Sequence, residues 1–201
     1  MTKLRKTTVA LTSKAAPFAI RAERASDVVA REALLDACFG ENRHARTCQR
    51  LRDGRVPAEG LALSAVVQGQ LVGTVRLWHV SAGGVPALML GPLAVDSAFR
   101  KLGVGAALMD RALAAARARS HRAVLLLGDA PYYARFGFSV GKTRELKLPG
   151  AFERERLLAL EFEGGALDGA WGMIVPTGAS VPKQKAVRAR KVLRTTAVVQ
   201  A

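Results

Sequence analysis

Apolar and polar positions alternate with different periods along the chain, and the changes of period mark the expected elements. An apolar segment at 18–21 predicts a short first strand. Apolar residues at helical spacing then predict a helix from 28 to 39, with Ser26 and Asp27 as capping residues. Residues 41–53 predict a second, strongly basic helix. The face of the first helix that is expected to be buried carries Val28, Val29, Ala33, Leu34 and Ala37.

The middle of the chain consists of apolar runs separated by glycine-containing turns, which is typical of β-strands. Runs at 61–68 and 70–80 predict a hairpin around Gly69, and a further strand covers 86–95. A helix to about Ser120 follows, and the continuous apolar run at 122–127 predicts a buried strand. Shorter elements are expected later in the chain: a brief helix at 131–135 and strands at 146–148 and 157–162.

This order of elements predicts an α/β domain with a mixed central sheet flanked by helices. The connection from Val95 through the long helix to Val124 is expected to be a right-handed crossover between parallel strands. Pro92 cannot donate to a strand ladder and, beside Gly91, predicts a bulge or a splay of the sheet. A splay would leave backbone donors and acceptors free to pair with an extended ligand.

One turn has the features of a phosphate-binding site. Arg100, Gly103 and Gly105 form an Arg-x-x-Gly-x-Gly turn between the strand that ends at Val95 and the long helix. A helix N-terminus presents free N–H groups with partial positive charge, and glycine lets a phosphate approach the backbone. Coenzyme A, which has amides followed by a pyrophosphate, would match both the splay and the turn. A dinucleotide fold is disfavoured, because a hairpin precedes the turn and no acidic residue is placed to hold a ribose.

Composition bounds the domain organisation. The chain has 201 residues, half of them hydrophobic and 23% charged, as expected for one globular domain. The net charge is +15, but ten basic residues and no acidic residue lie in the two end segments, which leaves 21 basic against 16 acidic residues between them. We therefore expect a basic N-terminal tail at 1–17, a folded domain at 18–178 and a basic C-terminal tail at 179–201.

The tails and the cysteines limit the expected partners and location. The tails could dock on nucleic acid, but neither interleaves aromatic residues or carries a nucleic-acid motif, so a solvated tail is the simpler interpretation. No apolar run reaches the ~20 residues that cross a bilayer, so no membrane partner is expected. Cys38 and Cys48 make no disulfide framework, which favours a cytoplasmic location. The cysteines and histidines show no metal-ligand spacing.

Two segments, one at the glycine turn and one after the strand at 122–127, match the motifs of a known family. Leu93-Ala-Val-Asp-Ser-Ala-Phe-Arg-Lys-Leu-Gly-Val-Gly105 and Tyr133-Ala-Arg-Phe-Gly-Phe138 resemble the central cofactor motif and the Tyr-x-x-x-Gly-Phe element of the GNAT superfamily of N-acetyltransferases. The resemblance covers roughly residues 18–175 and is nearest to a bacterial subgroup for which it names no acceptor.

The resemblance implies an enzyme that transfers the acetyl group of acetyl-CoA, a co-substrate, to a primary amine of a small molecule or peptide. The transfer would be direct, in a ternary complex, without a metal, in a monomer or homodimer. Backbone groups of Leu93 and Val95 would pair with the pantetheine amides, and an N–H near Leu93 or Ala94 would stabilise the oxyanion. The pyrophosphate would be held by Arg100, Lys101, Gly103, Val104, Gly105 and Ala106.

The resemblance implies Tyr133 as the general acid for the departing thiolate, since a phenol with a pKa near ~10 is protonated at neutral pH. Tyr132 is the competitor, and Tyr133 could instead only pack or hold the sulfur. For the base, Asp129 could hold the acceptor amine, relay a proton through water or cap the short helix. His79 could act as a base or be a packed residue, and Glu41 could reach the acceptor or cap a helix.

Two further points stay open at this stage. The arginines at 43–52 could attract an acidic acceptor or the 3′-phosphate of coenzyme A, or they could form a solvated helix face. The alternative to an enzyme is a sensor or adaptor that binds acetyl-CoA or coenzyme A without catalysis and docks through its basic tails.

Overall fold

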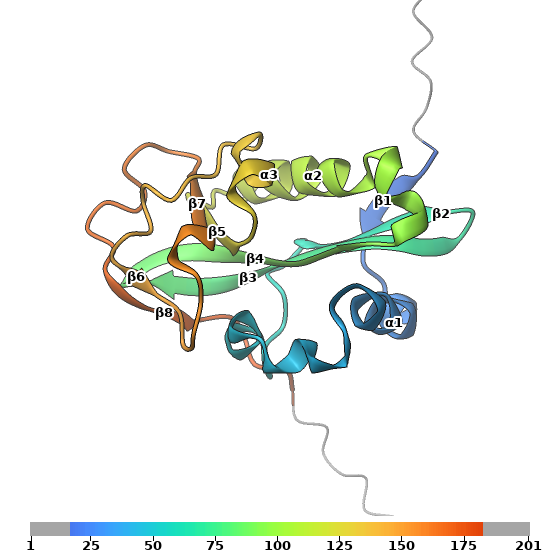
Figure 1. The fold of residues 1–201 in the computed structure, drawn as a ribbon, viewed down its shortest axis with the longest axis horizontal. Helices are drawn as coiled ribbons and strands as arrows, with labels where there is room; N and C mark the ends of the chain where they lie inside the picture. Colours follow the sequence, from blue (N-terminus) through green and yellow to red (C-terminus); the bar gives the residue numbers. More distant parts are fainter. Residues whose placement is uncertain (1–16, 183–201) are drawn as a thin grey trace, which may run out of the picture.

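The computed structural model describes residues 17–182 and places a central sheet between two layers of helices (Figure 1). The strands follow the order β1-β2-β3-β4-β5-β7, with β8 joined to β3 and β6 joined to β8. Strands β4 and β5 are parallel and connected through α2, which confirms the predicted parallel crossover, and the other pairs on this path are antiparallel. The predicted mixed α/β architecture is therefore confirmed. The strands are β1 (Ala19–Ala22), β2 (Ala62–Val67), β3 (Gln70–Ala82), β4 (Val85–Val95), β5 (Ala123–Leu127), β6 (Leu146–Lys147), β7 (Leu157–Glu161) and β8 (Gly172–Pro176).

The helices divide between the two faces of the sheet. Helices α2 (Val104–Ala118) and α3 (Ala130–Ala134) lie above it in Figure 1, and α1 (Val28–Phe39) lies below it together with short 3-10 turns. Within residues 17–182, no helix is long and apolar enough to span a membrane.

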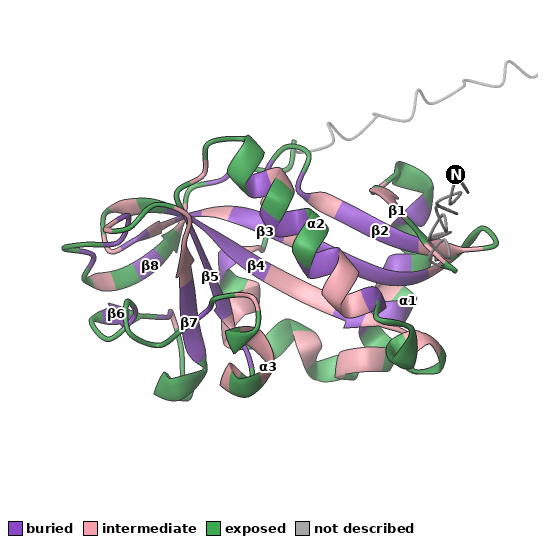
Figure 2. Ribbon diagram, turned by 90° about the horizontal axis from the view of Figure 1, so that it is seen from above, coloured by how far each residue is buried: buried purple, intermediate pink, exposed green. Residues whose placement is uncertain are grey.

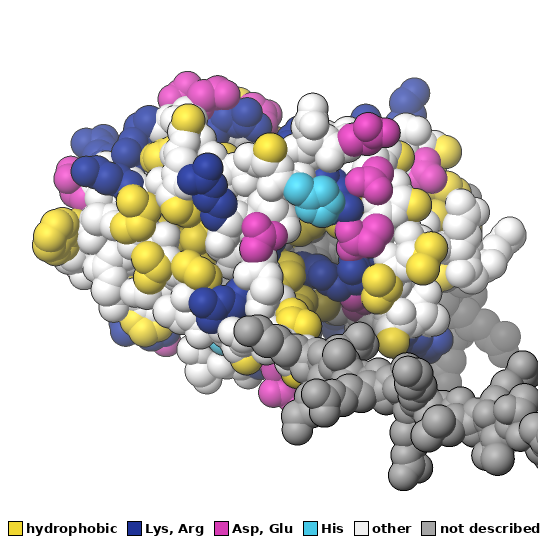
Figure 3. Space-filling model, turned by 90° about the horizontal axis from the view of Figure 1, so that it is seen from below, with side chains coloured by type: hydrophobic (Ala, Val, Ile, Leu, Met, Phe, Trp, Pro, Cys, Tyr) yellow, Lys and Arg dark blue, Asp and Glu magenta, His cyan; other side chains and the backbone are white. Residues whose placement is uncertain are grey.

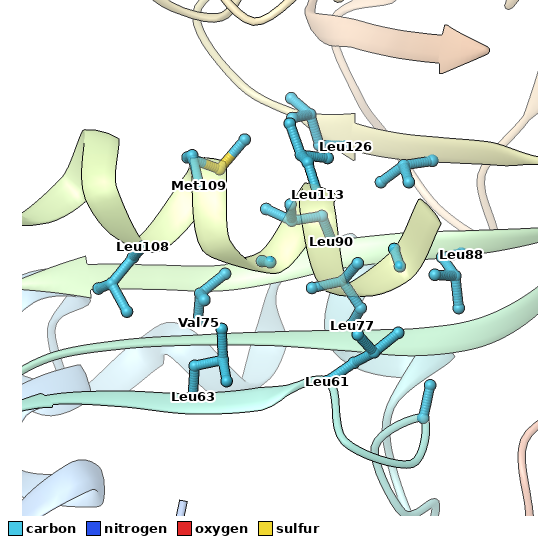
Figure 4. Close-up of a cluster of buried hydrophobic side chains, with 14 of the residues drawn as sticks. Leu61, Leu63, Val75, Leu77, Leu88, Leu90, Leu108, Met109, Leu113 and Leu126 are labelled. Carbon is cyan, nitrogen blue, oxygen red and sulfur yellow. The ribbon is translucent and has the colours of Figure 1, made fainter. Parts of the chain in front are cut away.

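The main core lies between α2 and the sheet. Leu108, Met109 and Ala112 recur on one face of α2, are fully buried, and pack with β-strand residues such as Leu77 (Figure 4). Burial of one such leucine stabilises the fold by about 1.5–3 kcal/mol. Figure 2 shows where residues are buried: buried residues are concentrated in the central strands, and exposed residues lie on the outer turns of the helices.

The central sheet opens between β4 and β5. These strands pair only at Leu88 with Val124 and at Met89 with Leu125, whereas β4 continues to Val95. On its other edge β4 remains paired with β3 as far as Val95, with a register shift opposite Leu90–Leu93. The splay predicted from Pro92 is therefore confirmed, and it leaves one edge of β4 without a strand partner.

The first helix faces the sheet differently from the prediction. Val28 and Val29 are exposed, whereas Arg31, Leu34 and Leu35 are buried. The side chain of Asp27 does not cap the helix; it accepts hydrogen bonds from Arg21, the backbone N–H of Arg24 and Ser64. The buried Arg31 forms ion pairs with Glu23 and Glu32, and a hydrophobicity pattern does not register such pairs.

The predicted basic helix at 41–53 is also wrong. The segment forms two short 3-10 turns, Glu41–Ala45 and Thr47–Leu51, separated by Arg46 in an extended conformation. The interruption turns Arg43 and the half-buried Arg52 inward, so the fully solvated helix face, one of the alternatives left open for these arginines, does not form.

The folded region continues past the expected boundary at 178. Ala179 accepts a hydrogen bond from Val56, Ser180 pairs with Arg55 in an isolated bridge, and Val181 donates to Gly54. The rest of the tails expected at 1–17 and 179–201, namely residues 1–16 and 183–201, lies outside the described residues.

Candidate active site

Two adjoining cavities lie along the unpaired edge of β4. The larger has a volume of about 900 Å³ and the smaller about 390 Å³, and both are lined by Phe39, Leu93 and Tyr132. The face of the molecule that carries α1 is hollowed near its centre, with basic side chains inside the hollow and acidic side chains beside it (Figure 3). A ligand that lies along β4 can therefore extend from one cavity into the other.

The smaller cavity is built around the predicted glycine turn. The Oδ1 atom of Asp96 accepts a hydrogen bond of 2.9 Å from the N–H of Ala98, which starts the 3-10 turn Ser97–Leu102. Gly103 then has a φ of +77°, a conformation that favours glycine, and directly precedes α2. The first N–H groups of α2 have no acceptor within the helix, as at any helix N-terminus, so the turn offers donors for an anion.

Most residues predicted to hold the cofactor lie together around this smaller cavity. Lys101 and Val104 are outside its lining: Lys101 is exposed, and the side chain of Val104 is fully buried in the core. Val104 can therefore contribute only its backbone. The predicted residues that line the smaller cavity are Leu93, Ala94, Val95, Arg100, Gly103, Gly105 and Ala106.

Three lining residues, Cys38, Phe39 and Arg135, were missed by the sequence analysis. The guanidinium carbon of Arg135 lies 4.5 Å from the centre of the Tyr132 ring, and Arg135 adds positive charge to the smaller cavity. The thiol of Cys38 donates to the carbonyl of Val95 at 3.5 Å. Arg135 lies inside the Tyr-x-x-x-Gly-Phe segment, but only the packing of α3 against the turn reveals where it points.

The adjacent tyrosines occupy different places. A Cβ at Gly105 would lie 3.3 Å from the hydroxyl oxygen of Tyr132, so Tyr132 lies against the glycine turn. Tyr132 lines both cavities, whereas Tyr133 lines only the larger one, and its ring lies so close to Gly128 that a Cβ there would meet it at 2.2 Å. The two rings meet edge to face with their centres 4.9 Å apart.

Burial controls the protonation of Tyr133. It raises the pKa of the phenol to about 12, with the neighbouring Tyr132 acting in the same direction. Tyr133 is therefore protonated throughout the neutral range and can donate a hydrogen bond or a proton into the larger cavity.

The candidate bases separate clearly in space. Asp129 lines the larger cavity, and its carboxylate does not cap α3; its backbone carbonyl instead accepts the N–H groups of Tyr132 and Tyr133. The capping role proposed for its side chain is therefore wrong. His79 lines neither cavity, and its ring lies 5.4 Å from that of His121. Glu41 is exposed and also lies outside both linings.

The larger cavity has an arginine-rich wall, to which the segment 43–52 contributes three arginines. Three of the lining arginines have carboxylate partners nearby: Arg43 binds Glu32, Arg76 binds Glu23 and Arg156 binds Glu153. Trp78 lines the same wall and donates from its indole Nε1 to the carbonyl of Gly91 at 2.6 Å. The arginines that line the cavity are Arg43, Arg46, Arg52, Arg76 and Arg156, and its acidic residues are Glu32, Asp129 and Glu153. Across residues 17–182, no three His, Cys, Asp or Glu side chains are grouped so that they could hold a metal ion.

Comparison with known proteins gives consistent matches. The sequence profile of the acetyltransferase (GNAT) family matches residues 29–138. The chain is 31% identical over 162 residues to the Escherichia coli K12 protein YhbS, named as an uncharacterized N-acetyltransferase, which covers 77% of this chain and 93% of YhbS.

Solved structures agree with the sequence matches. The structure of Escherichia coli YhbS in complex with CoA superimposes with a TM-score of 0.68 at 29% identity, covering 83% of this chain and 93% of the other. A GNAT family acetyltransferase from Brucella melitensis in complex with acetyl-CoA gives a TM-score of 0.58 at 27% identity, covering 80% of this chain and 96% of the other.

Proposed function

The chain belongs to the acetyltransferase (GNAT) family, and from this premise we propose that it transfers the acetyl group of acetyl-CoA to a primary amine by direct attack in a ternary complex. As a member of this family it is an acyl-CoA-dependent N-acyltransferase. The observation that carries the proposed mechanism is the pair of cavities that meet at Leu93 on the open edge of β4. One end offers an anion cradle, and the other offers groups that can bind an amine and donate a proton.

The donor side of the site fits coenzyme A. The free N–H groups at the start of α2 and the side chain of Arg100 suit a pyrophosphate. The unpaired edge of β4 near Leu93 and Val95 suits the amides of the pantetheine arm, which would pair with it like an added strand. The bound co-substrate supplies one activated acyl group as a thioester.

The acceptor side of the site has groups that can transfer protons and orient the acceptor amine. Asp129 is exposed to the larger cavity and can hold the acceptor amine or pass its proton to water. A backbone N–H near Leu93 or Ala94 can stabilise negative charge on the acetyl oxygen. When the new C–N bond forms and the C–S bond breaks, Tyr133 can donate a proton or a hydrogen bond to the departing sulfur.

Cofactor binding tests the donor side. We expect acetyl-CoA and CoA, but not NAD, to stabilise the purified chain against thermal unfolding, by about 2.7 kcal/mol at a hundredfold excess over the dissociation constant. Gly105→Val adds bulk against the Tyr132 hydroxyl and should abolish this stabilisation. Gly164→Val, at an exposed glycine with open space around it, is the matched control and should retain it.

Turnover tests the catalytic part. With a panel of primary amines and thiol release as the readout, Tyr133→Phe should lower kcat by about 100-fold or more while acetyl-CoA affinity is retained. Tyr132→Phe is the comparison variant. Because the pKa of Tyr133 is about 12, the rate should show no loss from this group below pH 10. Acetyl-CoA binding without turnover on any amine would instead favour a non-catalytic sensor.

A further inference from the structure

Arg52 is a half-buried cation in the wall of the larger cavity, and it has no carboxylate partner among residues 17–182. It follows the 3-10 turn Thr47–Leu51 and lines the cavity. Its Nε atom is buried and has no hydrogen-bond acceptor among residues 17–182. No carboxylate in the described part of the chain lies within ion-pair distance of its guanidinium.

The surroundings of Arg52 compensate for its charge only in part. Burial lowers the pKa of its guanidinium; Cys48 and Asp53 oppose this shift, whereas Arg43 and Arg76 add to it. Both neighbours are bound to acidic side chains, Arg43 to Glu32 and Asp36, and Arg76 to Glu23. A charge that is partly withdrawn from water and has no ion-pair partner destabilises a fold unless something binds it. The folded chain itself offers no such group in the residues that the structure describes.

Building on the proposed acetyl transfer, we infer that Arg52 binds a carboxylate of the acceptor, so that the acceptor is a small amino acid carrying both an amine and a carboxylate. The guanidinium presents a planar fork of N–H donors that matches the two oxygens of a carboxylate. A phosphate would favour several uncommitted cations, whereas the neighbouring Arg43 and Arg76 already have partners. Asp129 on the same cavity gives the amine of such a zwitterion a complementary charge.

Matched pairs of ligands test this inference by binding. The full chain saturated with CoA would be titrated calorimetrically with glycine, β-alanine, 4-aminobutanoate and 6-aminohexanoate, each beside its carboxamide. At least one acid should bind about 10- to 100-fold more tightly than its carboxamide, the range expected for hydrogen bonds to a charged group. The series also measures the span between the amine and carboxylate sites. Equal affinities within every pair, or no binding of any acid, would overturn the inference.

Variants assign the preference to Arg52. Arg52→Gln should remove the preference for the acid, and Arg52→Lys, which keeps the charge but loses the fork, should retain part of it. Arg50→Gln is the control, because Arg50 lies in the preceding turn, is exposed and lines neither cavity. An unchanged preference in Arg52→Gln would contradict the inference. So would a loss of affinity for CoA but not for dephospho-CoA, which would assign Arg52 to the 3′-phosphate.

The inference and the proposed function fail in different ways. If the acids bind in an Arg52-dependent manner but accept no acetyl group from acetyl-CoA, the carboxylate site stands and the proposed transfer fails. If neutral amines are acetylated as fast as the acids, the transfer stands and the carboxylate site is wrong.

Discussion

Two regions of the molecule treat arginine side chains in opposite ways. Those near β1 and α1 are ion-paired with carboxylates, whereas the arginine that follows the Thr47–Leu51 turn has no carboxylate partner in the described chain. Near α1, Glu23 binds both Arg31 and Arg76, and Glu32 binds both Arg31 and Arg43. The side chains of Arg31 and Glu23 are only 7% and 10% exposed, yet every guanidinium in this network has a carboxylate. Arg52 is half-buried close to the same network, with its Nε atom fully buried, and has no carboxylate in the described chain.

This difference between the two regions distinguishes arginines that stabilise the fold from an arginine that is available to bind a ligand. In the network, each charge is neutralised inside the fold, so its removal is expected to affect stability first. At Arg52 the described part of the fold leaves the charge without a carboxylate partner, so its removal is expected to affect ligand binding first and to favour stability. Three changes can test this separation.

The strongest effect is expected when the network loses its central carboxylate. Glu23→Gln would leave Arg76 without an ion pair and Arg31 with Glu32 alone, and it should lower the free energy of unfolding by about 3–5 kcal/mol. Denaturant unfolding measures this loss. Glu163→Gln is the control, because the Arg122–Glu163 pair is exposed and should contribute no more than about 1 kcal/mol. Similar losses of unfolding free energy in both variants would mean that the network stabilises the fold no more than an exposed ion pair does.

A smaller effect is expected at the edge of the network. Asp27 accepts hydrogen bonds from Arg21, Arg24 and Ser64, and the pairing with Arg21 holds its pKa well below the usual range. Asp27→Asn should lower the free energy of unfolding by about 2 kcal/mol at neutral pH. A depressed pKa in the folded state stabilises the fold above the unfolded pKa near ~3.9, and this contribution is lost as pH falls below it.

The pH dependence provides the check on Asp27. Thermal unfolding of the unmodified chain and of Asp27→Asn is compared from pH 7 down to pH 3. The difference in their free energies of unfolding should be constant above about pH 5 and shrink below pH 4. A difference that grows toward low pH would have the wrong sign for a depressed pKa.

The smallest effect is expected at Arg52, and its sign is reversed. Arg52→Met replaces a half-buried cation, which has no carboxylate partner among the described residues, by an apolar chain, and it should raise the free energy of unfolding by about 1 kcal/mol. The melting temperature without ligand measures this gain. A clear loss of stability would show that Arg52 is a structural residue like those near α1, and the contrast between the two regions would no longer hold.

The sequence predicted those parts of the molecule whose causes are local. The conformation of Gly103 and the free N–H groups after it follow from a short turn, and Pro92 indicated the opening between β4 and β5. Strand β8 was missed because its apolar run, Met173-Ile174-Val175, is only three residues long and lies between Gly172 and Pro176. The pairing of β8 with β3 is set by tertiary packing.

The acceptor side was not predictable for a related reason. A run of arginines at 43–52 is equally consistent with a solvated face and with a cavity wall, and only the break at Arg46 turns Arg43 and Arg52 inward. The burial of Arg31 depends on Glu23, which belongs to a different element. Long-range ion pairs of this kind leave no periodic signal in a sequence.

The opening beside β4 has a further consequence for how the protein avoids unwanted assembly. Past Met89, β4 presents one side of its main chain to a cavity, so the sheet has an edge that faces inward. Sheet edges on a protein surface are templates that recruit strands from other chains. Here Phe39 from α1 and Tyr132 from α3 stand on either side of that edge, at the point where the two cavities join. A slender flexible molecule can occupy the position of the missing strand, while a strand carried by a folded neighbour is kept out.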